Sequence, residues 1–180
     1  RVDYELLHKG RYPLLHKAFA RFQKKIPEDY AQFCKEQEDW LPDFALFMAL
    51  KDAHDGEPWS KWDVGLRRRE EDALASARKK LAEGIEFWKM VQYLFYSQWK
   101  SLKTYANEKG IRMIGDVPIY VALDSADVWA EPGQFYLGNN LQPIDVAGCP
   151  PDAFSEDGQL WGNPLFRWEV MKKDGYRWWI

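Results

Sequence analysis

The sequence is short of the residues that mark several classes of protein. It has two cysteines and three histidines in 180 residues. Cys34 and Cys149 form neither a CxxC motif nor a disulfide framework, which favours a reducing, cytoplasmic location. The histidines lack metal-ligand spacing, and the motif HExxH does not occur. We therefore expect no metal site of the common kinds and no disulfide-stapled fold.

The sequence also lacks long apolar runs and a strong excess of positive or negative charge. No stretch is apolar over the length that spans a bilayer, so we expect no membrane partner. The net charge is −3 and the pI is near 5.7. The basic residues 67–69 are followed at once by the acidic residues 70–72, a mixture typical of a solvated helix face. Nucleic-acid binding is therefore not expected either.

Aromatic residues are abundant instead. They make up 16% of the chain and include ten tryptophans. The sequence starts at Arg1 and stops at "GYRWWI", an apolar and aromatic stretch. Exposed indoles of this kind usually meet a partner surface. We expect the sequence to be a piece of a larger protein.

The pattern along the chain changes near residue 110. Residues 1–110 are predicted to be mainly helical, with breaks at Gly10 and Pro13. Residues 64–109 read as one helical region whose apolar stripe is core, ended by Gly110. "IRMIGDVPIYV" then predicts a buried strand, the α-to-β change of an α/β fold. A loop-rich stretch and a return to helix follow it.

Acidic groups follow this strand. Asp116 lies within it, and Asp124, Ser125 and Asp127 come after it. In a βα barrel, functional residues lie at the carboxyl ends of strands, where carboxylates bind sugar hydroxyls or move protons. Asp124 or Ser125 would equally serve as the cap of a turn that begins at Ala126. The residues alone leave both interpretations open.

A second candidate is the stretch 150–164, "PPDAFSEDGQLWGNP". It is predicted to be a loop, and it is too long and too aromatic for a simple connection. The faces of Phe154 and Trp161 could stack on pyranose rings, with acids and amides between them binding hydroxyls. The alternative is a tryptophan that anchors a surface loop to the core.

Two further groups receive no chemical role. Trp59 and Trp62 are predicted to pack in the interior. Glycoside cleavage needs two carboxylates at a defined distance across the scissile bond. Adjacent carboxylates such as Glu156 and Asp157 rarely point at one centre, so we do not assign them this task.

Three segments carry a resemblance to a known family. "GDVPIYVALDSADVWAEP", "VAGCPPDAFSEDGQLWGNPLFRWEVM" and "GYRWWI" closely resemble the 4-α-glucanotransferases of glycoside hydrolase family 77, which include bacterial amylomaltase and plant disproportionating enzyme. The residues before 111 resemble the family more loosely, so the resemblance covers essentially the whole chain.

The resemblance implies an α/β fold, a partial TIM (β/α)8 barrel. Residues 1–110 would form a mainly helical part that includes a helical insertion. Residues 111–180 would supply one barrel strand, a long loop-rich insertion at the active site and the following helix. It also implies transfer of an α-1,4-glucan segment to the 4-hydroxyl of an acceptor, by a retaining covalent mechanism without metal or organic cofactor.

The resemblance also implies which residues of this chain touch the substrate. Asp116 matches an acidic residue of the third barrel strand, and the loop after that strand holds a DSADVW segment. Residues 150–158 match a mobile loop that overhangs the substrate, and Trp161 lies in a WGNP segment near the catalytic centre. The substrate-binding candidates are Asp116, Asp124, Ser125, Asp152, Phe154, Ser155, Trp161 and Asn163.

One departure limits what this chain can do alone. The family's nucleophile lies in a segment of the type RIDHFRG, and no such segment occurs in the 180 residues. We therefore assign no catalytic residue here and expect the isolated chain to be inactive. The expected partners are α-1,4-glucan oligosaccharides, such as maltodextrins, and the remainder of the barrel. The alternative function is a non-catalytic carbohydrate-binding module.

Overall fold

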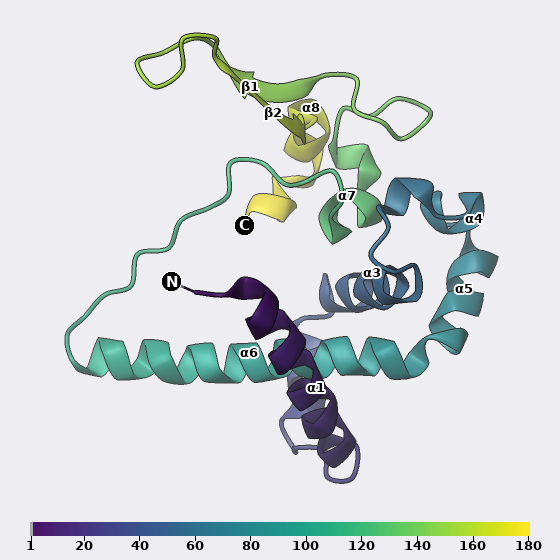
Figure 1. Ribbon diagram of the computed structural model, residues 1–180, viewed down its shortest axis with the longest axis vertical. Coiled ribbons are helices and arrows are strands. Elements are labelled where there is room, and N and C mark those ends of the chain that lie inside the picture. Colours follow the sequence, from purple (N-terminus) through teal and green to yellow (C-terminus); the bar gives the residue numbers. More distant parts are fainter. Residues whose placement is uncertain (1) are drawn as a thin grey trace. The chain divides into compact units, whose positions relative to one another are not determined.

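The chain forms two compact units, each built from two separate stretches of sequence (Figure 1). The computed structural model describes residues 2–180. The helical unit comprises Arg1–Ala49 and Ala77–Gly115, and the loop-rich unit comprises Leu50–Ser76 and Asp116–Ile180. A division at residue 110 stays a prediction about a larger domain. Within this chain, residues 50–76 pack with the C-terminal part.

The helical unit contains α1 (Tyr4–Phe22), α2 (Tyr30–Glu36), most of α3 (Leu41–Ala53) and α6 (Ala82–Glu108). Asp3 caps α1 by accepting a hydrogen bond from the Leu6 backbone N–H at 2.9 Å. The predicted breaks at Gly10 and Pro13 are wrong, because α1 runs through both. A proline removes only one intrahelical hydrogen bond, and side chains of α1 join the unit's core, which offsets the loss.

The predicted helical region 64–109 is divided in three. α4 (Val64–Arg67), α5 (Glu71–Lys80) and α6 are separated at Arg69, whose φ is 56°, and at Leu81. The predicted end of this helical region at Gly110 is confirmed. The N–H of Gly110 bonds to the Asn107 carbonyl at 2.9 Å, and the next N–H bonds to the Ala106 carbonyl at 3.0 Å. Gly110 has a φ of +76°, as this C-terminal motif requires.

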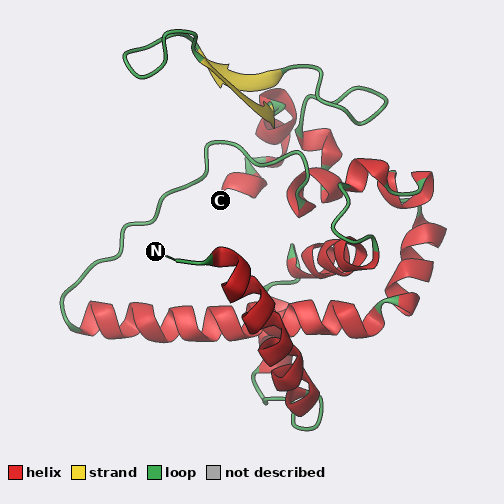
Figure 2. Cartoon of the chain, in the orientation of Figure 1, coloured by secondary structure: helices red, strands yellow, loops and turns green. Residues whose placement is uncertain are grey.

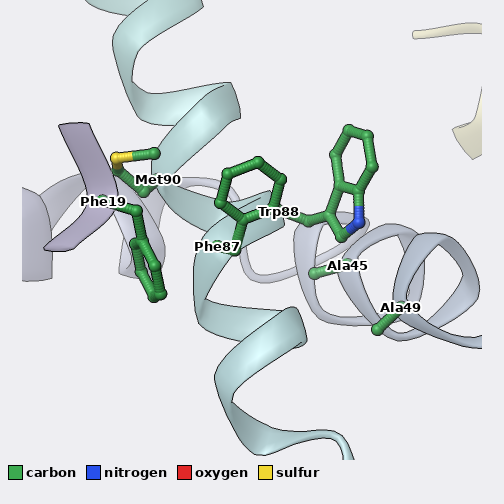
Figure 3. Packing of buried hydrophobic residues seen from close by; sticks show 6 residues of the cluster. All are labelled: Phe19, Ala45, Ala49, Phe87, Trp88 and Met90. Carbon is green, nitrogen blue, oxygen red and sulfur yellow. The ribbon is translucent and has the colours of Figure 1, made fainter. Parts of the chain in front are cut away.

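The core of the helical unit gathers around α6. Figure 3 shows its six buried residues, which are Phe19, Ala45, Ala49, Phe87, Trp88 and Met90. The apolar stripe of α6 is only partly core, because Val91 and Leu94 pack against this cluster whereas Phe95 and Leu102 are exposed.

The loop-rich unit has little regular structure (Figure 2). Its sheet, the one sheet within residues 2–180, pairs β1 (Val146–Cys149) and β2 (Gln159–Pro164) antiparallel. Around it lie short helices: the 3-10 helix η1 (Trp59–Lys61), α4, α7 (Ala126–Ala130), η2 (Pro132–Gln134), α8 (Trp168–Met171), η3 (Lys172–Asp174) and η4 (Arg177–Trp179). The predicted return to helix near the C-terminus is thus reduced to single turns.

The predicted barrel strand is not paired in this structure. Residues 111–119 have no regular secondary structure, and their side chains are exposed. Val117 and Ile119, which a buried strand would hide, are both largely exposed. A strand needs hydrogen-bonding neighbours, and the described residues offer it none. Within residues 2–180, no helix is both long enough and apolar enough to cross a membrane.

Two tyrosines fasten α2 and its N-terminal turn to α6. The hydroxyl of Tyr93 donates to Asp29 Oδ1 at 2.6 Å, and that of Tyr30 donates to Glu86 Oε2 at 3.0 Å. The bond to Asp29, and then burial, raise the pKa of Tyr93 to about 12. Burial, then a contact with Cys34 and the charge of Glu86, raise the pKa of Tyr30 as well.

These contacts predict how stability depends on alkaline pH. The folded chain holds the Tyr93 proton to a pH of about 12, whereas the unfolded chain releases it near the ordinary value of 10.0. The stabilisation is complete below pH 10.0 and is lost as the pH rises to about 12. We expect Tyr93→Phe to lower the free energy of unfolding by about 1 kcal/mol at neutral pH. Urea unfolding should show a shallower alkaline fall in the variant. Identical falls in the two proteins would contradict the assignment.

Candidate functional site

The candidate site is built on a hairpin that two glycines allow to close. A side-chain carbon added at Gly148 would lie 2.5 Å from the carbonyl oxygen of Gln159 on the opposite strand. One added at Gly158, whose φ is +73°, would lie 2.6 Å from the carbonyl oxygen of Cys149. The two backbones therefore approach as closely as only glycine permits.

The loop at the hairpin end, residues 150–158, folds on its own polar side chains. Asp152 Oδ1 accepts hydrogen bonds from the backbone N–H groups of Phe154 and Ser155, at 2.8 and 2.9 Å. The Ser155 hydroxyl donates to the Gly158 carbonyl at 2.7 Å. Phe154 is left 94% exposed. Asp152 and Ser155 thus shape the loop, which presents an aromatic ring to solvent.

Trp161 and Asn163 lie on β2, so the prediction of a loop throughout 150–164 is wrong for residues 159–164. The indole N–H of Trp161 donates to Gln159 Oε1 at 2.9 Å, and its ring meets the ring of Tyr120 at a centroid distance of 6.1 Å. Trp161 nevertheless remains 45% exposed. The Asn163 side chain donates to the Val121 carbonyl at 2.8 Å. This side chain ties β2 to the segment after the predicted strand.

Asp124 and Ser125 meet different partners. The Asp124 carboxylate accepts hydrogen bonds from the Lys51 ammonium at 2.7 Å and from the Trp59 backbone N–H at 3.1 Å. The Ser125 hydroxyl accepts a bond from the Val128 N–H at 3.3 Å and caps α7. The interpretation of Ser125 as a cap is therefore confirmed.

Asp116 makes no hydrogen bond or ion pair with the other candidates among the described residues. It is exposed, in the irregular segment 111–119. The structure brings Trp161 and Asn163 to residues 120 and 121, and it groups Asp152, Phe154 and Ser155 in one loop.

The sequence analysis did not predict an aromatic cluster around Phe166, which follows β2 in the chain. Phe166 is buried and has rings on several sides, those of Tyr120, Phe135, Trp168, Trp178 and Trp179, at centroid distances of 5.1 to 5.9 Å. The flat stacking of Tyr120 on Phe166, with 13° between the rings, fixes the residue that Trp161 contacts. The aromatic count was visible in the sequence, but no spacing indicated which rings meet.

The predicted packing of Trp59 and Trp62 is confirmed, since both side chains are buried.

Taken together, the site offers a partly exposed indole, an exposed phenyl ring and amide groups. Such groups bind a polar ring compound by stacking and hydrogen bonding. Glu156 and Asp157, the adjacent carboxylates in the loop, are both exposed.

Comparisons with known proteins agree on one family. The profile described as 4-alpha-glucanotransferase matches residues 1–180. The chain is 51% identical to a 4-alpha-glucanotransferase of Thermus thermophilus, over 100% of this chain and 37% of that protein. It is 39% identical to a chloroplastic/amyloplastic 4-alpha-glucanotransferase of Solanum tuberosum, over 100% of this chain and 32% of that protein.

A solved structure is similar as well. An amylomaltase from Streptococcus agalactiae in complex with acarbose superposes with a TM-score of 0.93 at 46% identity. The match covers 99% of this chain and 36% of that one. The chain therefore spans little more than a third of the length of such proteins.

The hairpin geometry predicts a large difference between two glycine substitutions. Gly148→Ala would push a methyl group against the Gln159 carbonyl, so we expect it to lower the free energy of unfolding by about 1–3 kcal/mol. Gly133→Ala is the matched control, because a carbon added there meets nothing within 4 Å. Hydrogen exchange of residues 146–149 and 159–164 should rise only in the first variant. Equal protection in both would rule out the close approach.

Proposed function

We propose, from the premise that the chain belongs to the 4-alpha-glucanotransferase family, that its protein transfers segments of α-1,4-glucans to the 4-hydroxyl of an acceptor glucan or glucose. The family match over residues 1–180 supports this activity, as do the relatives that carry its name. Maltodextrins or glycogen-like glucans are the proposed substrates, and the cytoplasm is the proposed location.

The proposed chemistry is retaining. An aspartate would attack the anomeric carbon and form a covalent glycosyl-enzyme, and a glutamate would protonate the departing oxygen and later activate the acceptor hydroxyl. We assign neither role to a residue of this chain, because the RIDHFRG type of segment is absent from its 180 residues. Residues 111–121 would supply a strand of a (β/α)8 barrel whose other strands would lie in the remainder of a longer protein.

The part proposed for this chain is to hold the glucan. The observation that carries it is the partial exposure of Trp161, whose indole N–H donates to Gln159 and whose ring makes an edge contact with the Tyr120 ring. A fixed aromatic plate binds the C–H face of a pyranose without losing side-chain freedom. Phe154 would add a second plate, and Asp116 an unengaged carboxylate for sugar hydroxyls.

Asp152, Ser155, Asn163 and Ser125 contribute indirectly in this proposal. Their side chains are already bonded to backbone groups of the loop, of residue 121 and of α7. They would therefore shape the surface on which the sugar rests.

Sugar binding is tested by titrating maltoheptaose while tryptophan fluorescence is recorded. We expect a saturable change, and Trp161→Ala should weaken binding about tenfold or more, which corresponds to ~1.4 kcal/mol. Trp99→Ala is the matched control, since Trp99 is 44% exposed against 45% for Trp161 but lies on α6 in the helical unit. Equal binding by the two variants would exclude Trp161 from the sugar site.

Transfer activity separates this proposal from a binding module. The 180-residue polypeptide should release no glucose from maltotriose, whereas a protein of the relatives' full length that contains it should. Glucose release by the 180-residue polypeptide, above that of a mock preparation, would show that its own residues suffice for catalysis. A full-length protein that binds maltoheptaose but transfers nothing would favour the carbohydrate-binding module.

A further inference from the structure

The carboxylate of Asp124 is engaged on both oxygens by groups far away in sequence. Oδ2 lies 2.7 Å from the ammonium of Lys51, a residue 73 positions earlier. Oδ1 accepts the backbone N–H of Trp59 at 3.1 Å. A sugar hydroxyl that bound these oxygens would compete with a charge-assisted bond, which is stronger than a neutral one.

All three protons of the Lys51 ammonium have a hydrogen-bond acceptor. The acceptors are Asp124 Oδ2, the Gly56 carbonyl at 2.7 Å and the Glu57 carbonyl at 3.0 Å. The side chain of Lys51 is 17% exposed, against 37% for Asp124. The Lys51 ammonium is therefore held by the turn that follows α3, and Asp124 is held by the ammonium.

Trp59 adds a second point of attachment. Its side chain is 1% exposed, and its indole N–H donates to the Leu123 carbonyl at 2.7 Å. Two consecutive residues, Leu123 and Asp124, thus receive three hydrogen bonds from residues 51 and 59. We call this arrangement the Lys51–Asp124 clasp.

The other end of the same segment meets the candidate sugar site. The Val121 carbonyl accepts the bond from Asn163, and the Tyr120 ring contacts Trp161. Only Ala122 lies between these contacts, at residues 120 and 121, and the clasp at residues 123 and 124. A shift of the segment would therefore move the ring against which Trp161 rests.

We propose that Lys51 and Asp124 are positioning residues, which hold residues 120–124 so that Trp161 presents its face to the glucan. This inference rests on the proposed function, and it gives Asp124 an indirect role in place of direct contact with the sugar. Displacements of this kind matter because a misplacement of about 1 Å can change a reaction rate on the order of a hundredfold.

A double-mutant cycle tests whether Lys51 and Asp124 act through one shared contact. Lys51→Met, Asp124→Asn and the double variant are titrated with maltoheptaose. We expect each single change to weaken binding about tenfold, and the double variant to be no weaker than the worse single one, because both changes break one shared contact. Asp124→Asn is the milder test of folding, since its amide oxygen can still accept the Trp59 N–H. Losses that multiply, or a Lys51→Met variant that binds like the wild type, would overturn the proposal.

A second measurement does not depend on sugar. In ¹H–¹⁵N spectra, Lys51→Met and Asp124→Asn should shift the indole N–H resonances of both Trp59 and Trp161. Lys89→Met is the matched control, because Lys89 pairs with Glu86 at 2.8 Å in the helical unit and is 24% exposed. In the spectrum of Lys89→Met, both indole resonances should keep their wild-type positions. If wild-type chain binds no maltoheptaose, the proposed sugar site fails. Shifted Trp161 resonances would still support the clasp, and an unmoved Trp161 resonance would refute it.

Discussion

The hydrogen bond from the indole of Trp59 to the Leu123 carbonyl joins the two stretches of sequence from which the loop-rich unit is built. The two residues are 64 positions apart, and the donor side chain is almost wholly buried. A buried indole N–H without a partner would be destabilising, so this bond satisfies the donor while the ring fills space. Beside this contact, the Asp124 carboxylate bonds to Lys51 and to the Trp59 backbone N–H.

The same chemistry recurs elsewhere in this unit. The indole of Trp129 donates to the Leu66 carbonyl at 3.0 Å, and that of Trp178 donates to Asp127 at 3.0 Å. Each bond links segments that share no helix or strand. With only one short hairpin in the described residues of the unit, tryptophans supply apolar area and a directed donor together. The abundance of tryptophan is thus explained in part by structure, whereas Trp161 and Trp168 stay about half exposed.

Features set by neighbouring residues could be predicted from the sequence. The glycine that ends α6 and the serine that caps α7 depend on a few adjacent backbone groups. The course of α1 through Pro13 could not be predicted, because packing outweighs the local preference. Strand β2 was missed because its pairing requires Gly148 to approach another backbone closely. Most of the candidate site came from resemblance to a family, and the role of Lys51 required the fold.

The exposed segment 111–119 has a consequence for how copies of this chain meet one another. Val117 and Ile119 would tend to join any free β-edge, including that of another copy. Between and beside them stand Pro118, which has no N–H to donate, and the charge of Asp116. Residues of these two kinds are gatekeepers, which slow unwanted strand pairing. The acidic residue that is a candidate for touching sugar would then also keep newly made chains apart.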